Sequence, residues 1–232
     1  MIERSLPAGS GHLARVRCSE RCDGDFAVRS NPELLARARS SLAPGPWTWL
    51  QQVHGANVVV VDEPGAQCGA HADASVTACV DAVLSVQTAD CAPLVLAGEG
   101  LVGLVHVGWR GIVEGVIGAT FDRLHGLGGE EIHALLGPCI APAGYQFGSA
   151  ELDLVASVAG DSVRSTTTEG SPALDLRAAV SAQCRDAGVS SFSVVGPPKS
   201  ATPFDTADSR WYSHRTRGES ERQTTVAWLE KR

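Results

Sequence analysis

The chain has 232 residues, of which 44% are hydrophobic and 19% are charged, and its formal net charge is -7. This composition is typical of a soluble globular protein with enough apolar residues for a core. The negative charge argues against a surface for nucleic acid or anionic membranes, and no apolar stretch is long enough to cross a bilayer, so we expect neither partner.

The N-terminal residues and the cysteines predict a reducing compartment. Residues 1–5 lack the charged-then-apolar layout of a signal peptide. The seven cysteines are an odd number without regular spacing. We therefore expect free thiols rather than disulfides, and a cytoplasmic location.

In the first half of the chain, strand patterns follow one predicted helix. Asn31 has the features of an N-cap and is followed by proline and an acid, which predicts a helix to about Leu42 that Pro44-Gly45-Pro46 ends. Runs rich in β-branched and apolar residues predict strands over 58–61, 82–86, 94–97 and 101–105.

In the second half, helices and strands alternate irregularly. Apolar residues recur at helical spacing from Arg110 to about Leu124. Helices are also predicted over 151–158 and 175–187, the latter with Asp175 as N-cap and Gly188 as its stop. Strands are predicted over 132–136, 192–195 and 225–229, and a loop over 162–172.

The order of these elements predicts the fold class. Strands mostly follow strands, and helices are inserted without strict alternation, which favours an α+β fold with a mixed sheet over a doubly wound fold. The chain shows no internal repeat and no convincing linker. We therefore expect residues 1–232 to form a single domain.

Three short motifs each place one metal donor at or just past an apolar run. They are Gln52-Val53-His54-Gly55, Thr88-Ala89-Asp90-Cys91 and His106-Val107-Gly108-Trp109-Arg110-Gly111. Taken singly, each histidine or cysteine is more often a structural residue than a ligand. Together, two imidazoles and one thiolate give the ligand count of a catalytic zinc, which keeps its fourth position open. The hypothesis is a zinc enzyme with His54, Cys91 and His106 as ligands.

The step after His106 predicts an anion site beside these donors. If His106 ends a strand and a helix begins near Arg110, free backbone N–H groups and the Arg110 guanidinium lie next to the metal. The alternative is an arginine that forms a surface salt bridge.

Other motif matches fail on context. Residues 98–103 match G-x-G-x-x-G, but a strand follows the glycines where a helix is needed, so we interpret them as a hairpin turn. The H-x-E and P-C-x-x-C signature of zinc deaminases is not met, because Asp73 replaces Glu and Pro142 replaces the second cysteine. The only methionine is Met1, which argues against a blue-copper centre. The spacing of Cys18 and Cys22 does not fit C-x-x-C, and we expect them on a surface loop or strand.

At these motifs the chain resembles the laccase-domain family, also called multicopper polyphenol oxidases. Bacterial members of that family are also described as purine nucleoside phosphorylases and as a peptidoglycan editing factor. The resemblance runs through residues 52–55, 72–77, 88–91, 106–111 and 136–140, and continues weakly through 175–176 to 212–215. It implies a mixed β-sandwich flanked by helices, with zinc on His54, Cys91 and His106.

The resemblance also implies a function and roles for further residues. The function is zinc-dependent phosphorolysis of adenosine, inosine and methylthioadenosine, with adenosine deamination as a side activity. The expected partners are a purine nucleoside and phosphate, and the protein is expected to be a monomer or homodimer. Copper(II) generally binds such sites more tightly than zinc and can replace it in vitro. The predicted catalytic residues are Asp90, Arg110 and Asp73, and the predicted substrate-binding residues are Gln52, Arg21, Ser213 and Arg215.

Two segments depart from the family pattern and keep alternatives open. Residues 18–24 replace the segment T-T-R-x-G-G-x-S, with Arg21 in place of its arginine, and residues 214–222 replace R-R-D-G-x-T-G-R. One alternative is a cysteine hydrolase or amidase of peptidoglycan precursor editing, with Cys91 as nucleophile and His106 as base. Another is a binding protein for nucleosides or cell-wall precursors, and a copper-dependent polyphenol oxidase is less favoured.

Overall fold

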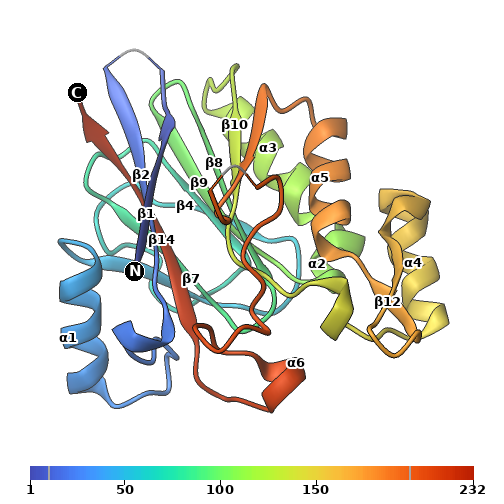
Figure 1. The fold of residues 1–232 in the computed structure, drawn as a ribbon. Helices are drawn as coiled ribbons and strands as arrows, with labels where there is room; N and C mark the ends of the chain where they lie inside the picture. Colours follow the sequence, from blue (N-terminus) through green and yellow to red (C-terminus); the bar gives the residue numbers. More distant parts are fainter. Residues whose placement is uncertain (10, 199) are drawn as a thin grey trace.

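The protein is built from two six-stranded mixed sheets that pack against each other, with helices on both outer sides (Figure 1). This computed structural model describes residues 1–9, 11–198 and 200–232. In sheet order, the first sheet contains β1 (Ile2–Pro7), β2 (His12–Cys18), β14 (Gln223–Lys231), β7 (Val83–Thr88), β3 (Trp47–Gln51) and β5 (Ala70–His71). The second contains β13 (Ser191–Val194), β10 (His133–Leu136), β8 (Ala92–Gly98), β9 (Leu101–Val107), β6 (Ala74–Thr77) and β4 (Val58–Val60). The α+β architecture predicted from the element order is confirmed.

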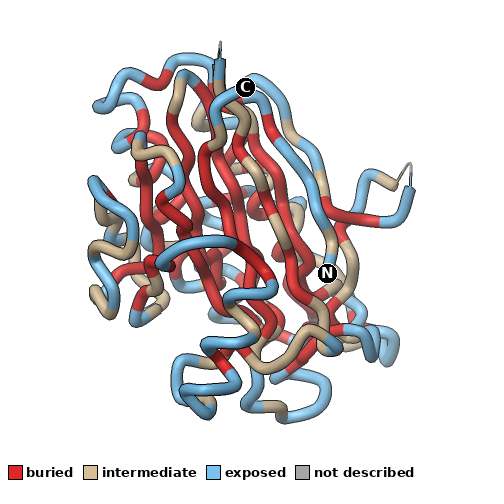
Figure 2. Tube along the Cα trace, turned by 90° about the vertical axis from the view of Figure 1, so that its left-hand side faces the viewer, coloured by how far each residue is buried: buried red, intermediate tan, exposed pale blue. Residues whose placement is uncertain are grey.

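The side chains of β8 show how the second sheet divides the core. Leu94 and Leu96 pack on the helix side of the sheet, whereas Val95 and Ala97 face the first sheet. Successive side chains of a strand point to opposite faces, so a strand buried on both faces is a continuous apolar run. Figure 2 shows that the central strands are buried along most of their length, with exposed residues gathered in the connecting loops.

Helices cover the outer face of each sheet. The α-helices are α1 (Pro32–Leu42), α2 (Trp109–Glu114), α3 (Val116–Gly126), α4 (Ser149–Ala159), α5 (Leu176–Asp186) and α6 (His214–Arg217). Short 3-10 helices lie at Arg21–Asp23, Pro142–Gly144 and Asp161–Val163. Helix α1 packs on the first sheet, while α3 and α5 lie on the opposite side of the molecule against the second (Figure 1). Among the described helices, none has the length and apolar character needed to span a membrane.

Several local predictions agree with the structure. Asn31 caps α1 by accepting hydrogen bonds from the backbone N–H groups of Glu33 and Leu34, and Asp175 caps α5 in the same way through Ala178. The turn between β8 and β9 is a two-residue hairpin in which Glu99 and Gly100 have φ angles of 51° and 73°. Positive φ at both positions is what a type I′ hairpin requires, so the glycine-rich match is a turn. All seven cysteines are free.

Three local predictions were wrong. The helix predicted from Arg110 to about Leu124 is two helices, because Gly115 adopts the left-handed conformation (φ 81°) that ends α2. The loop predicted over 162–172 contains the strand β11 (Arg164–Thr166), which pairs with β12 (Pro172–Leu174). Cys18 is only 2% exposed, because it lies at the end of β2 with its side chain in the core between the two sheets, whereas Cys22 is exposed.

The end of β8 yields a stability prediction. A Cβ at Gly98 would lie 2.0 Å from the backbone oxygen of Glu131, whereas a Cβ at Gly118, on the exposed face of α3, meets open space. We expect Gly98→Ala to lower the free energy of unfolding by about 1–3 kcal/mol or more, because backbone must move. The matched control Gly118→Ala is expected to stabilise the protein by up to about 1 kcal/mol through helix propensity. Urea unfolding of both variants measures the difference, and equal stabilities would contradict the close approach.

Candidate metal centre

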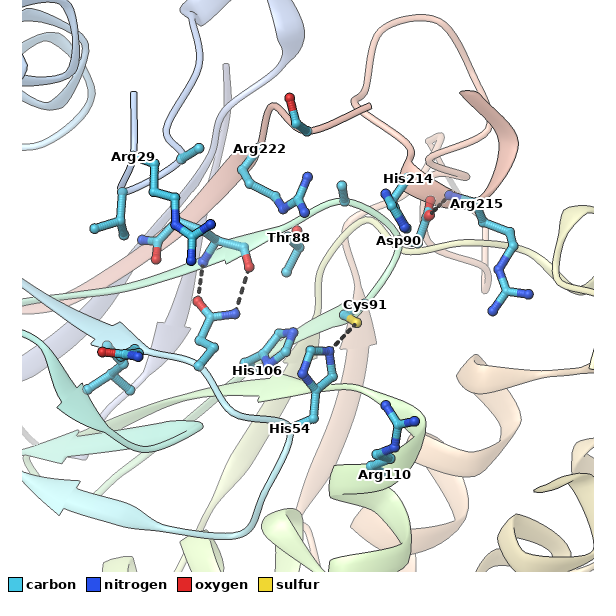
Figure 3. Close-up of a pocket in the computed structure, with 18 of the residues that line it drawn as sticks. Arg29, His54, Thr88, Asp90, Cys91, His106, Arg110, His214, Arg215 and Arg222 are labelled. Carbon is cyan, nitrogen blue, oxygen red and sulfur yellow. Dashed lines mark hydrogen bonds between the residues drawn. The ribbon is translucent and has the colours of Figure 1, made fainter. Parts of the chain in front are cut away.

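The three predicted metal donors meet at one point of the structure. The ligand atoms of His54, Cys91 and His106 all lie within 4.8 Å of one another, and Cys91 Sγ is 3.8 Å from His54 Nε2. Figure 3 shows the two imidazole rings and the thiol side by side at one wall of a pocket. His54 lies in the loop after β3, Cys91 directly before β8, and His106 near the end of β9.

The course of the chain explains this meeting. Strand β7 belongs to the first sheet and β8 to the second, so residues 89–91 cross from one sheet to the other. In β9, Val102 and Leu104 face the first sheet, and His106 continues this alternation. The candidate centre therefore lies at the end of the sandwich, between the two sheets.

A buried carboxylate fixes both histidines. Asp73 is 0% exposed and accepts hydrogen bonds from the backbone N–H groups of Val53, His54 and Gly55, at 3.1, 2.9 and 2.8 Å. It also bonds His106 Nδ1 at 2.8 Å. These bonds support the left-handed conformation of His54 (φ 61°), which is uncommon for a residue with a Cβ. Asp73 thus sets the position of two of the three donors.

The same contacts make His106 suitable as a ligand. With Nδ1 hydrogen-bonded to a carboxylate, Nε2 is the nitrogen left to bind a metal, an arrangement common in zinc proteins. Space is also reserved around the donors, because a Cβ at Gly108 would lie 2.6 Å from a ring carbon of His54 and 3.4 Å from Cys91 Sγ. Two imidazoles and one thiolate fit a divalent ion of borderline softness.

The charges and hydrogen bonds around Cys91 and His106 favour a thiolate at Cys91. Burial opposes ionisation of Cys91, but the charge of His106 and hydrogen bonds from His106 and His54 outweigh it and lower the pKa of Cys91 to about 6. Burial likewise lowers the pKa of His106, but Cys91 and Asp73 outweigh it and raise that pKa to about 9. At neutral pH the thiol is therefore deprotonated, which is the form that binds metals, whereas His106 is protonated and would release a proton on binding one.

The donors line a pocket of about 820 Å³, within the range of about 300–1,000 Å³ that is typical of small-molecule sites. Asp90, the neighbour of Cys91, also lines it. The Asp90 carboxylate accepts hydrogen bonds from Thr206 Oγ1, Ser213 Oγ and the backbone N–H of Arg215, at 2.9, 2.6 and 2.6 Å. Asp90 therefore ties the loop before α6 to the crossing between the sheets.

Other predicted site residues occupy different environments. Arg110, Arg215 and Gln52 line the pocket, and the Gln52 side-chain amide makes hydrogen bonds of 2.8 Å with both backbone groups of Gln87. Ser213 is buried behind Asp90 and does not line the pocket. Arg21 does not line it either.

The Arg21 guanidinium instead holds a surface loop together. It donates to the backbone oxygens of Ser209 and Trp211, pairs with Glu219 at 2.7 Å and lies over the Tyr212 ring. These contacts give Arg21 a structural role in the described fold, and the prediction that it binds substrate has no support in the geometry.

Sequence reasoning missed several residues that line the pocket. They include Arg29, Thr88, Tyr145, His214 and Arg222. Thr88 belongs to a motif quoted for Cys91, but nothing in the local pattern marks Arg29, which precedes α1, or Arg222, which precedes β14. Only the folded chain brings these segments to one cavity.

Comparisons with known proteins place the chain among relatives of one family. A family model described as multi-copper polyphenol oxidoreductase laccase matches residues 9–230. A protein of Mycobacterium tuberculosis (strain ATCC 25618 / H37Rv) named purine nucleoside phosphorylase is 35% identical over 212 residues, covering 90% of this chain and 82% of the relative. A protein of Xylella fastidiosa (strain 9a5c) with the same name is 37% identical over 220 residues, covering 85% and 80%.

Solved structures share the fold. YlmD from Geobacillus stearothermophilus superposes with a TM-score of 0.79 at 24% identity, covering 98% of this chain and 94% of that one. The Neisseria meningitidis protein NMB0706 gives a TM-score of 0.78 at 22% identity, covering 99% and 98%.

The role of Asp73 yields a prediction about metal affinity. Asp73→Asn keeps the shape of the side chain but removes one acceptor oxygen, so a backbone N–H or the His106 ring loses its partner. We expect zinc affinity to fall about 10- to 100-fold, measured by competition with a chromogenic chelator. The matched control is Asp62→Asn, since Asp62 is exposed and does not line the pocket. Equal zinc affinities in the two variants would contradict a positioning role for Asp73.

Proposed function

Because the chain belongs to the multi-copper polyphenol oxidoreductase laccase family, we propose that it is a zinc-dependent purine nucleoside phosphorylase. Its substrates are adenosine, inosine and methylthioadenosine, and adenosine deamination is a side activity. The names of the relatives at 35% and 37% identity support the phosphorylase. The family match over 9–230 also supports a single domain over residues 1–232.

One observation carries the proposal. Three metal-binding atoms within 4.8 Å of one another form a wall of a cavity that arginine side chains also line. Phosphorolysis needs an anion held against C1′ of the ribose while the purine leaves. A pocket that combines an ion site with guanidinium groups supplies the charge for that task.

Arg110 is the residue we assign to the phosphate. It follows Trp109 at the start of α2, lies over the Trp109 ring at 4.7 Å, and forms no salt bridge with a carboxylate of the described residues. Arg215 is the second phosphate residue, although its side chain bonds the Gln146 backbone oxygen, stacks on Tyr145 and points away from Cys91 in Figure 3. Helix α2 is too short for its N-terminus to add a separate anion site.

The two aspartates act by positioning. Asp73 is completely buried and its carboxylate is occupied by backbone amides and His106, so it orients ligands rather than touching substrate. Both Asp90 oxygens accept hydrogen bonds from Thr206, Ser213 and Arg215. We therefore assign Asp90 to holding Arg215 at the pocket rather than to proton transfer.

His54, Cys91 and His106 would hold zinc. When bound, zinc supplies a Lewis acid that polarises oxygen atoms and brings the pKa of water to about 7. A blue-copper centre commonly adds an axial methionine, and Met1, the only methionine, does not line the pocket. The donor set therefore supports zinc, with copper able to replace it in vitro.

A second candidate is a cysteine hydrolase or amidase of peptidoglycan precursors. The observation that favours it is the pKa of Cys91, which the neighbouring histidines lower to about 6. A thiolate in a pocket is a nucleophile as well as a ligand. Metal content separates the two candidates, because the hydrolase keeps its activity after the zinc is removed.

The phosphorylase makes a direct prediction. Zinc-loaded protein is incubated with adenosine, with and without phosphate, and the products are separated chromatographically. We expect adenine release that depends on phosphate. Cys91→Ala should lose its zinc and at least about 100-fold in rate, which corresponds to about 2.7 kcal/mol of transition-state stabilisation.

The matched control is Cys68→Ala, since Cys68 is exposed, does not line the pocket and belongs to neither cluster of possible metal ligands in the described residues. It should keep both zinc and rate. Absence of turnover by zinc-loaded wild type would exclude the phosphorylase, and activity that survives chelation but not Cys91→Ala would favour the cysteine hydrolase.

A further inference from the structure

The pocket carries more positive charge than one phosphate needs. Four arginines line it: Arg29, Arg110, Arg215 and Arg222. None of the four forms a salt bridge with a carboxylate in residues 1–9, 11–198 and 200–232. Asp90 is the one carboxylate among the described lining residues, and its oxygens are already hydrogen-bonded. In a chain of net charge -7, this concentration of cations indicates anionic ligands.

The arginines divide between two sides of the pocket. Arg110 and Arg215 come from α2 and α6 and lie on the side of Cys91 that faces these helices (Figure 3). Arg29 and Arg222 lie on the other side, with Thr88 between Arg222 and the metal donors in this view (Figure 3).

Hydrogen bonds hold the segments that carry Arg29 and Arg222 on the same side of the pocket. The Asp25 carboxylate accepts from the backbone N–H groups of Ala27 and Arg222, each at 2.9 Å. Phe26 donates its backbone N–H to the Arg222 oxygen at 2.9 Å. The segment that carries Arg29 is thus attached to Arg222 by two hydrogen bonds, although nearly 200 residues separate them in sequence.

A buried hydroxyl without a hydrogen-bond partner lies on this side of the pocket. Thr88 is 2% exposed and lines the pocket, and its Oγ1 has no hydrogen-bond partner among the described residues. Thr88 is the cross-strand partner of Gln223, the residue after Arg222. Buried hydroxyls are normally hydrogen-bonded, so an unpaired one on the wall of a pocket that Arg222 also lines is a donor for a ligand oxygen.

We infer that Arg29, Thr88 and Arg222 form a subsite for the 5′-phosphate of a purine nucleoside monophosphate, so that this nucleotide binds more tightly than the nucleosides of the proposed function. This inference rests on the proposed phosphorylase, in which Arg110 and Arg215 hold the orthophosphate. A neutral nucleoside would leave the two guanidinium groups and the hydroxyl without a ligand. A phosphate ester has a negative charge that attracts both guanidinium groups. Its oxygens accept hydrogen bonds from the guanidinium N–H groups and from the hydroxyl.

The reaction balances without an oxidant or reductant. An oxygen of orthophosphate forms a bond to C1′, and the C1′–N9 bond breaks with its electron pair going to the purine. The purine takes up a proton that the phosphate gives up. The products are the free purine base and ribose 1,5-bisphosphate.

The test compares adenosine, AMP and inorganic phosphate on zinc-loaded protein. Calorimetry measures the binding of each, and chromatography measures phosphorolysis of adenosine and AMP. We expect wild type to bind AMP at least 10-fold more tightly than adenosine. Arg29→Met and Thr88→Val should each reduce that ratio about 10-fold, and Thr88→Ser should restore most of it.

Thr88→Val also shows whether a loss of AMP preference comes from the lost hydroxyl or from a destabilised fold. It replaces a buried, unpaired hydroxyl by a methyl group of the same shape, so it should unfold at the same temperature as wild type or higher. Arg37→Met is the matched arginine control, because Arg37 is exposed on α1 and does not line the pocket. It should leave the AMP-to-adenosine ratio unchanged.

The outcomes distinguish this inference from the proposed function. If AMP binds no more tightly than adenosine, the subsite is wrong even when adenosine is phosphorolysed. If Arg29→Met and Thr88→Val weaken the binding of inorganic phosphate rather than the binding of AMP, then Arg29 and Thr88 hold the orthophosphate. That result would overturn the inference. If the AMP preference is present and falls in both variants but neither compound is phosphorolysed, the subsite is supported and the phosphorylase is wrong.

Discussion

The geometry of the candidate centre depends on one buried carboxylate. Asp73 accepts hydrogen bonds from three backbone N–H groups of the loop that carries His54, and it is hydrogen-bonded to the ring of His106. Burial raises the pKa of this carboxyl, but the hydrogen bonds from His106 and from the amides of Gly55 and His54 outweigh burial and hold its pKa below the usual range. A buried charge is tolerated only when its acceptor sites are filled, so the loop and the histidine are fixed together.

A second constraint is the short crossing between the sheets. Residues 89–91 leave β7 in one sheet and enter β8 in the other, and Asp90 within them has a φ of 97°. That conformation is uncommon for a residue with a Cβ, and it is held by hydrogen bonds from Thr206, Ser213 and Arg215. The Cys91 thiol is thereby directed at the two histidines, and the C-terminal loop is attached to the same point.

The charge of the protein is distributed unevenly around this point. Most of the salt bridges lie elsewhere, as between Arg15 and Glu230 or Arg164 and Asp153. At the pocket the arginines contact aromatic rings and carbonyl oxygens instead, as Arg110 does with Trp109 and Arg222 with the backbone of Glu221. Guanidinium groups held this way keep their charge available to a ligand.

The sequence by itself determined the elements with strong local patterns. These include α1 with its Asn31 cap, the hairpin of β8 and β9, and the identity of the three candidate ligands. Local rules suffice there, because capping, turn chemistry and donor type are properties of a few adjacent residues. The grouping of Arg29, Thr88 and Arg222, the use of Arg21 in a surface loop and the bonds of Asp73 were decided only by tertiary structure. These depend on which strand ends and loops meet at one end of the sandwich, and a strand pairing over more than 200 residues, such as Cys18 with Thr225, leaves no trace in local periodicity.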